Sequence, residues 1–470
     1  MMKRTLIPTL IFLMSVVGGL KGQLSFKNTT QYTQWDEFDR NIVESWTDLT
    51  YQKAQWLVGG RFEVNDPPDP FIFPRDTLVD EYELTYRFVQ YRYKRLTARL
   101  GNFYTIFGRG LVLRTYEDRN LRVDNNIDGL KLNFTGRSFK LQAIGGKMRD
   151  KYNRRPNTVF GFDGEWNAFG DLTVGGSFLR QGESSTDLHN VYAGRLKYSY
   201  NRLDFYGEVV KPQWHNALSY YGAINAFFSE MAFTFEVKDY NQLSFRNDYE
   251  TEYNAAPSLS REHSFALLNR HPHALNLNDE KGYQFEMTYF PATSTQITLN
   301  HSQTYSHSNK RIFNEYYGDI HHYFSDKLEG RLAAAYTYDF TTRTENLTPL
   351  TDLSYNMTPR DQIHINYQHQ HTINTVNKSE YDSELLILEY SRSPYLTAGL
   401  VGEYTNQHQL NNIDLDRHTW LYGNITLNFL RNQQLSVLYG SRQEGFVCVG
   451  GICRYEPEFE GIEIKLTIRF

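Results

Sequence analysis

The last residues of the chain alternate strictly between apolar and polar side chains. The apolar positions are Ile462, Ile464, Leu466, Ile468 and Phe470, and between them stand Glu463, Lys465, Thr467 and Arg469. A period of two predicts a β-strand with one dry face and one wet face. A terminal strand of this kind that ends in Phe is the signal read by the bacterial barrel-assembly machinery. That signal usually has Gly five residues before the end, where Lys465 stands here. We therefore expect Phe470 to be an assembly signal and its strand to close a transmembrane β-barrel.

The same alternation recurs along the chain. It is clear at residues 82–88 and 283–289, and about 24 strand-like runs follow one another from residue 24 with no convincing helix. A soluble β-sandwich would show the same period, because one face of each sheet would then be core and the other solvent. The strand pattern alone therefore does not separate a barrel from a sandwich or propeller.

The connections favour the barrel. Tight turns, for example at residues 94–95 and 200–202, alternate with longer connections such as 105–126, 240–280 and 442–460. Outer-membrane barrels have short periplasmic turns and longer extracellular loops. We expect an all-β protein: a single large antiparallel up-and-down transmembrane β-barrel of about 24 strands (22–26). An even strand number places both termini in the periplasm.

The N-terminal residues indicate export. Residues 1–22 have a basic start at Lys3 and Arg4, an apolar stretch over residues 6–17 and then small residues. This is the pattern of a signal peptide, and it is too short for a stable membrane-spanning helix. We expect residues 1–22 to be removed and residues 23–470 to form the barrel in the outer membrane.

Composition agrees with strands that face lipid. Aromatic residues are 15% of the chain, with 35 Tyr and 31 Phe, and the net charge is −5. Outer-membrane barrels carry aromatic girdles around a polar lumen. The charge balance argues against nucleic acid as a partner. The expected partners are outer-membrane lipid, the barrel-assembly machinery and other envelope proteins.

Residues 101–126 are the most distinctive stretch, because they begin as a strand and continue as a loop dense in Gly and charge. We consider this loop a candidate lumen constriction whose charges set the ionic field of a pore. The alternative is an exposed loop held by its own salt bridges, and the sequence leaves both open. The candidate constriction residues are Arg109, Arg114, Glu117, Asp118, Arg119 and Arg122.

This segment and a second one, VCVGGICRYEPEFEG at residues 447–461, resemble the two signature regions of an uncharacterised family of Bacteroidota outer-membrane β-barrels, a porin-like domain of unknown function. The similarity extends over most of the mature chain. The resemblance implies a barrel in the outer membrane of such bacteria. It implies no substrate and no catalytic residue.

The second segment contains the two cysteines of the chain, Cys448 and Cys453. In an oxidising envelope this spacing predicts a local disulfide around a Gly-Gly turn, which would contribute roughly 2 kcal/mol through loop entropy. A metal site would need further ligands, and none stands nearby.

The longest connection, residues 240–280, could be a lid, a partner surface or an exposed loop, and the last is favoured. No nucleophile lies in a motif such as Gly-x-Ser-x-Gly, so we expect no enzyme, no catalytic residue, no cofactor and no metal. The leading hypothesis is a porin-like passive channel for polar solutes with a loop-narrowed lumen. The alternative is a non-conducting barrel that acts as a scaffold or subunit of an envelope export or assembly complex.

Overall fold

The computed structural model describes residues 22–36, 38–69, 79–182, 188–246, 251–270, 273–410, 413–414, 417–449 and 452–470. The expected signal peptide, apart from Gly22, lies outside these residues. Twenty-four strands form one sheet. They are β1 Gln23–Trp35, β2 Arg40–Lys53, β3 Trp56–Asp66, β4 Tyr82–Tyr93, β5 Leu96–Phe103, β10 Ile127–Thr135, β11 Phe139–Met148, β12 Thr158–Phe169, β13 Leu172–Gly182, β14 Leu188–Tyr200, β15 Leu203–Pro212, β16 Ser219–Phe227, β17 Met231–Asn241, β18 Asp279–Ala292, β19 Thr295–Tyr305, β20 Arg311–Tyr323, β21 Leu328–Asp339, β22 Thr344–Asn356, β23 Asp361–Asn374, β24 Glu380–Arg392, β25 Leu396–Thr405, β28 Thr419–Phe429, β29 Gln433–Arg442 and β32 Phe459–Arg469.

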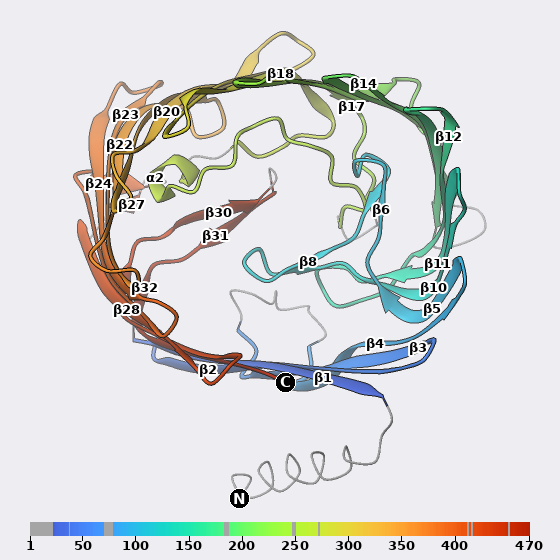
Figure 1. Cartoon of the computed structure of the whole chain (residues 1–470), viewed down its shortest axis with the longest axis horizontal. Coiled ribbons are helices and arrows are strands. Elements are labelled where there is room, and N and C mark those ends of the chain that lie inside the picture. The colour runs from blue at the N-terminus through green and yellow to red at the C-terminus, as the bar shows by residue number, and fades with distance from the viewer. Residues whose placement is uncertain are drawn as a thin grey trace, which may run out of the picture.

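Each strand of this sheet pairs antiparallel with the next one along the chain, and β1 pairs antiparallel with β32. The sheet is therefore a closed ring with no free edge (Figure 1). Closure satisfies every strand edge, which matters in hydrocarbon because an unpaired backbone group there costs several kcal/mol. The predicted fold class, an all-β up-and-down barrel of 24 strands, is confirmed.

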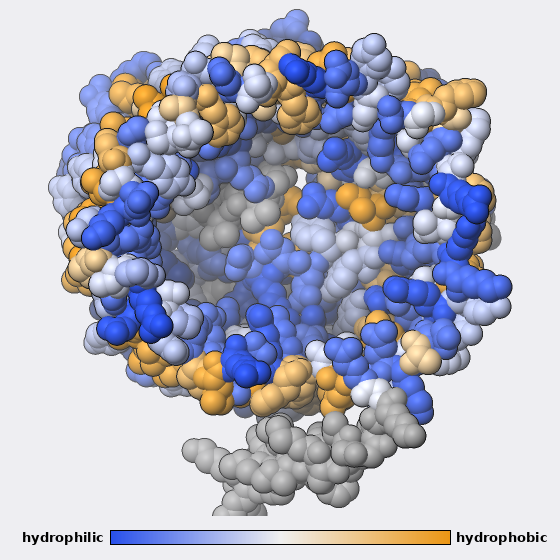
Figure 2. Space-filling view, viewed as in Figure 1, coloured by the Kyte–Doolittle hydropathy of each residue, from blue (hydrophilic) through white to orange (hydrophobic). Residues whose placement is uncertain are grey.

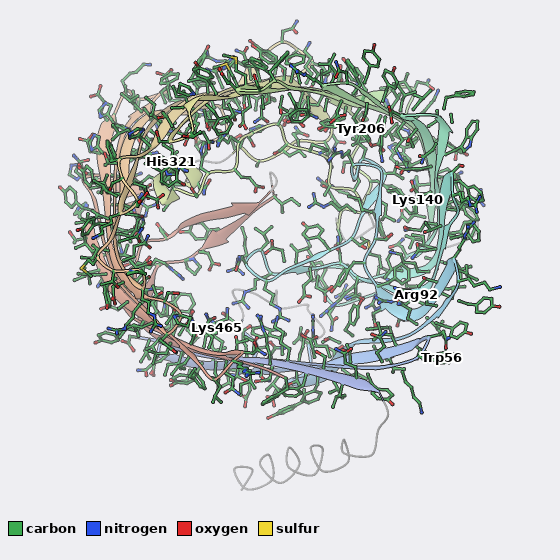
Figure 3. The ribbon with its side chains drawn as sticks, viewed as in Figure 1. Trp56, Arg92, Lys140, Tyr206, His321 and Lys465 are labelled. Atoms are coloured by element: carbon green, nitrogen blue, oxygen red, sulfur yellow. The ribbon has the colours of Figure 1, made fainter. Side chains whose placement is uncertain are left out.

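The barrel has its apolar side chains outside and its polar side chains inside. Along β32 the exposed Phe470 follows apolar positions that share the outer face, while Lys465 lies on the inner side of the wall (Figure 3). The hollow of the barrel is lined mainly by hydrophilic residues, and hydrophobic ones appear around the rim (Figure 2). Many large apolar side chains outside are exposed, for example Leu100, Trp56 and Phe169. This inverted pattern is expected of a barrel in lipid and excludes a water-soluble sandwich.

The turns that the sequence predicted to be tight all lie at one end of the barrel, where β1 begins and β32 ends. There the backbone of Phe26 and Phe470 exchange two hydrogen bonds of 3.1 and 2.9 Å, and their rings lie 6.0 Å apart. The other end holds the long connections, but not all are long: residues 36–39 and 340–343 each join two strands with only four residues. The alternation of turn length that the sequence predicted is therefore less strict than expected, while its phase is right throughout.

The smaller elements belong to connections. They are β6 Ile106–Phe107, β7 Leu113–Arg114, β8 Glu117–Asp118, β9 Val123–Asp124, α2 Ala266–Asn269, β26 Gln409–Leu410, β27 Ile413–Asp414, β30 Gly445–Val449 and β31 Ile452–Glu456. Seen along the barrel axis, three of these connections lie within the ring of strands: the ones that carry β6–β9, α2 and the β30–β31 hairpin (Figure 1). Within the described part of the chain, no helix has the length and hydropathy needed to cross a membrane.

Candidate functional site

The first connection that folds inward is residues 104–126, which we call the lumen segment. Its apolar residues Phe107, Leu111, Val112 and Leu113 are fully buried against inner-wall side chains of β10–β17, which form one hydrophobic cluster with them. Gly108 lets the backbone approach β15, because a Cβ there would lie 2.3 Å from the carboxylate of Glu208. The next amide, that of Arg109, donates to the same carboxylate at 2.9 Å. Of the two placements left open by the sequence, the structure has the one inside the barrel.

The second connection runs over residues 242–278, and its described residues, 242–246, 251–270 and 273–278, also lie inside. For these residues the expectation of an exposed loop is wrong. It packs on the lumen segment: the amide of Ala255 donates to Gly110 at 3.0 Å, and the amide of Arg114 donates to Tyr253 at 2.9 Å. Farther along, the amide of Leu267 donates to the Gln368 side chain on the inner face of β23 at 2.9 Å. Polar residues at 240–280 made the loop look solvated, but the inner wall that they contact is itself polar.

The third connection contains the β30–β31 hairpin. Ile452 lines one cavity of the lumen, and Arg454, Tyr455 and Glu456 line another. The backbones of Cys448 and Cys453 are direct partners in this hairpin. Their side chains lie outside the described residues, so the disulfide stays a prediction.

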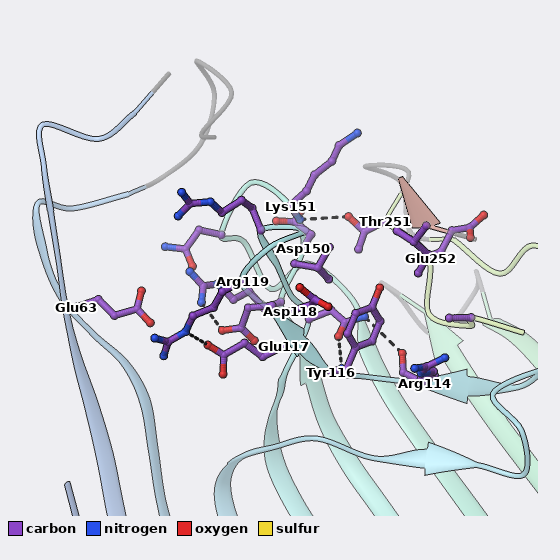
Figure 4. Close-up of a pocket in the computed structure, with 18 of the residues that line it drawn as sticks. Glu63, Arg114, Tyr116, Glu117, Asp118, Arg119, Asp150, Lys151, Thr251 and Glu252 are labelled. Carbon is purple, nitrogen blue, oxygen red and sulfur yellow. Dashed lines mark hydrogen bonds and ion pairs between the residues drawn. The ribbon is translucent and has the colours of Figure 1, made fainter. Parts of the chain in front are cut away.

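Two cavities that adjoin the lumen segment lie between these connections and the wall. The first, of about 550 Å³, lies toward the end with the long connections and is lined by residues that include Asn65, Asp150 and Thr251 (Figure 4). The second, of about 670 Å³, follows the inner face of β1 from Lys27 to Trp35. Eight residues of strand cover about 26 Å. The second cavity therefore extends over most of the height of the wall.

The two cavities meet at one group of side chains, because both are lined by Glu44, Trp46, Glu117, Arg119 and Arg122. We call this group the junction. Its wall residues come from β2, and the other three come from the lumen segment. A solute that passed from one cavity to the other would contact both groups.

Ion pairs hold the lumen segment to the wall at the junction. Arg122 lies 2.8 Å from Glu44 of β2, and Arg119 lies 4.0 Å from Asp48 of the same strand. Within the segment, Arg119 also lies 2.9 Å from Glu117. The guanidinium of Arg119 also lies over the Trp46 ring, 4.7 Å from its centroid. These charge-assisted contacts fix side chains that would otherwise move freely in a wet lumen.

The six candidate constriction residues do not all gather at this place. Glu117, Arg119 and Arg122 are at the junction, whereas Arg114 and Asp118 line only the first cavity (Figure 4). Arg109 lines neither cavity and instead lies over the ring of Tyr206 on β15, 5.1 Å from its centroid. The density of charge in this loop indicated a segment that lies inside the barrel. It did not separate the residues that line the cavities from those that face the wall.

Tyr116 stands between the charged residues of the segment and lines the first cavity. Burial raises its pKa to about 12, with Arg114 opposing the shift and the acidic side chains Asp118 and Glu252 adding to it. The phenol is therefore neutral at physiological pH. It adds a hydrogen-bonding group but no charge to the cavity.

The residues that the sequence reasoning missed are on the barrel wall. Glu44, Asp48 and Arg61 provide the partners for the lumen segment, and each occupies an inward position of an alternating strand. A signal existed: a charged residue on the polar face of a membrane strand must point into the lumen. The partners of Glu44, Asp48 and Arg61 in the lumen segment could not be predicted from this alternation. Within the described ranges, no group of His, Cys, Asp and Glu is placed to hold a metal ion.

Solved structures of bacterial proteins have a similar fold. A chain in the cryo-EM structure of the E. coli P pilus tip assembly intermediate PapC-PapD-PapK-PapG matches with a TM-score of 0.57 and 8% identity, over 96% of this chain and 61% of that one. The P pilus usher (PapC) translocation pore matches with a TM-score of 0.48 and 9% identity, over 95% and 98%. Pseudomonas aeruginosa OccK11 matches with a TM-score of 0.34 and 10% identity, over 96% of each chain.

At such identities the likeness concerns the fold alone, which is that of an outer-membrane β-barrel. The present chain spans about three fifths of the first of these chains. No curated protein matches the sequence. A model described as a family of unknown function, DUF6029, matches residues 2–470. The chain therefore belongs to the DUF6029 family of unknown function.

Proposed function

We propose that this protein is a passive channel of the bacterial outer membrane for small polar solutes, narrowed where its lumen segment meets the wall. The observation that carries the proposal is the pair of adjoining polar cavities, which share the five junction residues. By the usual orientation of such barrels, the first cavity faces the cell exterior and the tight turns face the periplasm.

Two features indicate that the proposed path for solutes through the lumen is narrow. The lumen segment fills the side of the barrel along β10–β17 together with part of the second connection, and a hydrophobic cluster joins both to the wall. The residues of the second connection in this cluster include Leu243, Phe245, Tyr253, Ala256 and Leu259. The remaining path follows β1–β3 and β32, and its narrow part is charged on both sides. A path of this kind admits water and small polar molecules, because its charged side chains interact favourably with them. Apolar solutes gain no such interaction, so they are not drawn into the path.

Conductance tests the proposal directly. Purified full-length protein in planar lipid bilayers is expected to give steady open channels. Gln31→Trp, on the inner face of β1, is expected to lower the single-channel conductance, because Gln31 lines the second cavity. Tyr32→Trp is the matched control, since the next residue of the same strand has the opposite orientation. Equal conductance in the two variants would show that current does not use this cavity.

A second candidate function is a non-conducting barrel that serves as a scaffold or subunit of an envelope complex. The observation in its favour is the same hydrophobic cluster, since a lumen packed with buried side chains is built to stay closed on that side. Folded protein that remains electrically silent in bilayers would support this candidate and contradict the channel.

A further inference from the structure

The seam that closes the barrel places two cations face to face in the lumen. Lys27 of β1 is the direct cross-strand partner of Arg469 of β32, and both side chains line the second cavity. Directly opposed like charges destabilise a strand pair. Lys465, four residues before Arg469 on the same strand, has the same inward orientation and lines the same cavity.

The carboxylates near this seam are already occupied. Asp48, the partner of Lys27 on β2, lies 2.6 Å from Arg61. Glu117 accepts from both Arg61 and Arg119. Among the described residues, no carboxylate lies within ion-pair distance of Lys27, Lys465 or Arg469, and Glu463 is the remaining acidic residue on this face of β32.

Positive charge continues along the same cavity. The lining also includes Arg119 and Arg122 of the lumen segment, Arg442 of β29 and Arg454 of β31. Basic side chains outnumber acidic ones in this lining. Because a narrow cavity with low-dielectric walls concentrates the field of its charges, an anion is favoured in it and a cation is not.

We infer that the second cavity binds and passes small anions, and that Lys27 and Arg469 hold the anion at the end with the tight turns. This inference rests on the proposed channel function and names its substrate class, solutes that carry a carboxylate or a phosphate. Both groups accept paired hydrogen bonds from a guanidinium, which Arg469 supplies, while Lys27 adds a point charge. An anion between the two cations would also remove their mutual repulsion.

Ion selectivity gives the first test. Across a gradient of potassium chloride, the reversal potential of the wild-type channel is expected to lie closer to the equilibrium potential of chloride than to that of potassium. Removing each charge is expected to lower the chloride-to-potassium permeability ratio by about two- to fivefold, so Lys27→Gln with Arg469→Gln should remove most of the preference. Charge reversal to Glu at both positions should invert it.

The control is Lys140→Glu. Lys140 lies on the part of the barrel formed by β11 and lines neither cavity (Figure 3). Its replacement by Glu changes the net charge by the same amount as the double Gln variant. Each variant is first checked for a folded barrel by heat-modifiable migration in gels. Conducting wild-type channels that prefer potassium would overturn the inference and leave the channel intact. So would an equal loss of selectivity in the control variant.

Binding is measured separately, so that a silent barrel still gives an answer. Anions that bind the folded barrel raise its thermal midpoint. At constant ionic strength, inorganic phosphate and acetate are compared with chloride, which separates the two ligand groups. The wild-type protein is expected to be stabilised by at least one of them, and the double Gln variant is not. Equal behaviour of the two proteins would remove the anion site.

Discussion

Arg61 on the inner face of β3 lies 2.7 Å from the carboxylate of Glu117 in the lumen segment. The same guanidinium holds Asp48 of β2 at 2.6 Å. One cation of the wall thus ties the lumen segment to two strands. Arg61 also lines the second cavity beside the junction, so in the proposed channel the anchoring of the segment would affect the width of the path.

Glu117→Gln should loosen this anchor. The substitution removes the charge that holds Arg61 and Arg119, and charge-assisted hydrogen bonds contribute about 1.5–3 kcal/mol. We expect larger and noisier single-channel currents than in the wild type. Asp118→Asn is the neighbouring control, because Asp118 accepts the local amides of Asn120 and Leu121 and forms no ion pair with another described residue. Currents that are unchanged in both variants would show that this ion pair does not limit the path.

Leu111→Ala should release the lumen segment from the opposite wall without touching either cavity. Leu111 is fully buried in the hydrophobic cluster, and such a truncation costs about 2–5 kcal/mol. Amide hydrogen exchange over residues 104–126 should speed up, while the barrel strands keep their protection. Leu100→Ala, on the lipid-facing side of β5, is the control for a Leu that is exposed. Similar exchange in both variants would contradict the packed role of the segment.

Lys238 and Glu280 form an ion pair with both side chains fully buried, and His273 lies 2.9 Å from the same carboxylate. Lys238→Met should destabilise the barrel by about 3–5 kcal/mol, because it leaves the charge of Glu280 buried without its cation. The measurement is the temperature at which the gel-shifted folded form disappears. Lys238→Met with Glu280→Gln should recover most of the loss. A double variant that is less stable than the single one would contradict this account.

His307 lies in the connection between β19 and β20, 2.8 Å from Asp239 and 2.7 Å from Asp279. Burial lowers the pKa of His307, but hydrogen bonds to these two carboxylates outweigh it and raise the pKa above its ordinary value. A raised folded-state pKa means that the ion pairs add stability below pH 6.5 and lose it as pH rises through that pKa.

The titration can be followed directly. The imidazole signal of His307 in detergent micelles should show a midpoint above about 6.5. His307→Gln should remove the part of the pH dependence of unfolding that lies between this value and the raised midpoint. A midpoint at or below 6.5 would contradict the pairing.

Cys448 and Cys453 are expected to be joined. Their backbones face each other in the β30–β31 hairpin, as a cross-strand bridge requires. Intact protein from oxidising conditions should be lighter by two hydrogen atoms than the reduced protein, and it should resist alkylation until reduced. Immediate alkylation of both thiols would show that the bridge is absent.

The sequence by itself determined the wall of the barrel. A period of two in side-chain polarity requires a two-faced strand, and the phase of the turns requires antiparallel neighbours, so both the strand count and the inward position of residues such as Lys465 followed from local pattern. These are short-range constraints, which is why the printed chain was enough to read them.

The tertiary structure alone decided what fills the lumen. Residues 104–126 and 242–278 look like solvated loops by composition, because a wet lumen and bulk water select the same polar side chains. Only the closed ring brings Glu117 to Arg61 and Leu267 to Gln368, pairs that are 56 and 101 residues apart in the chain. The opposition of Lys27 and Arg469 likewise exists only because the first strand meets the last.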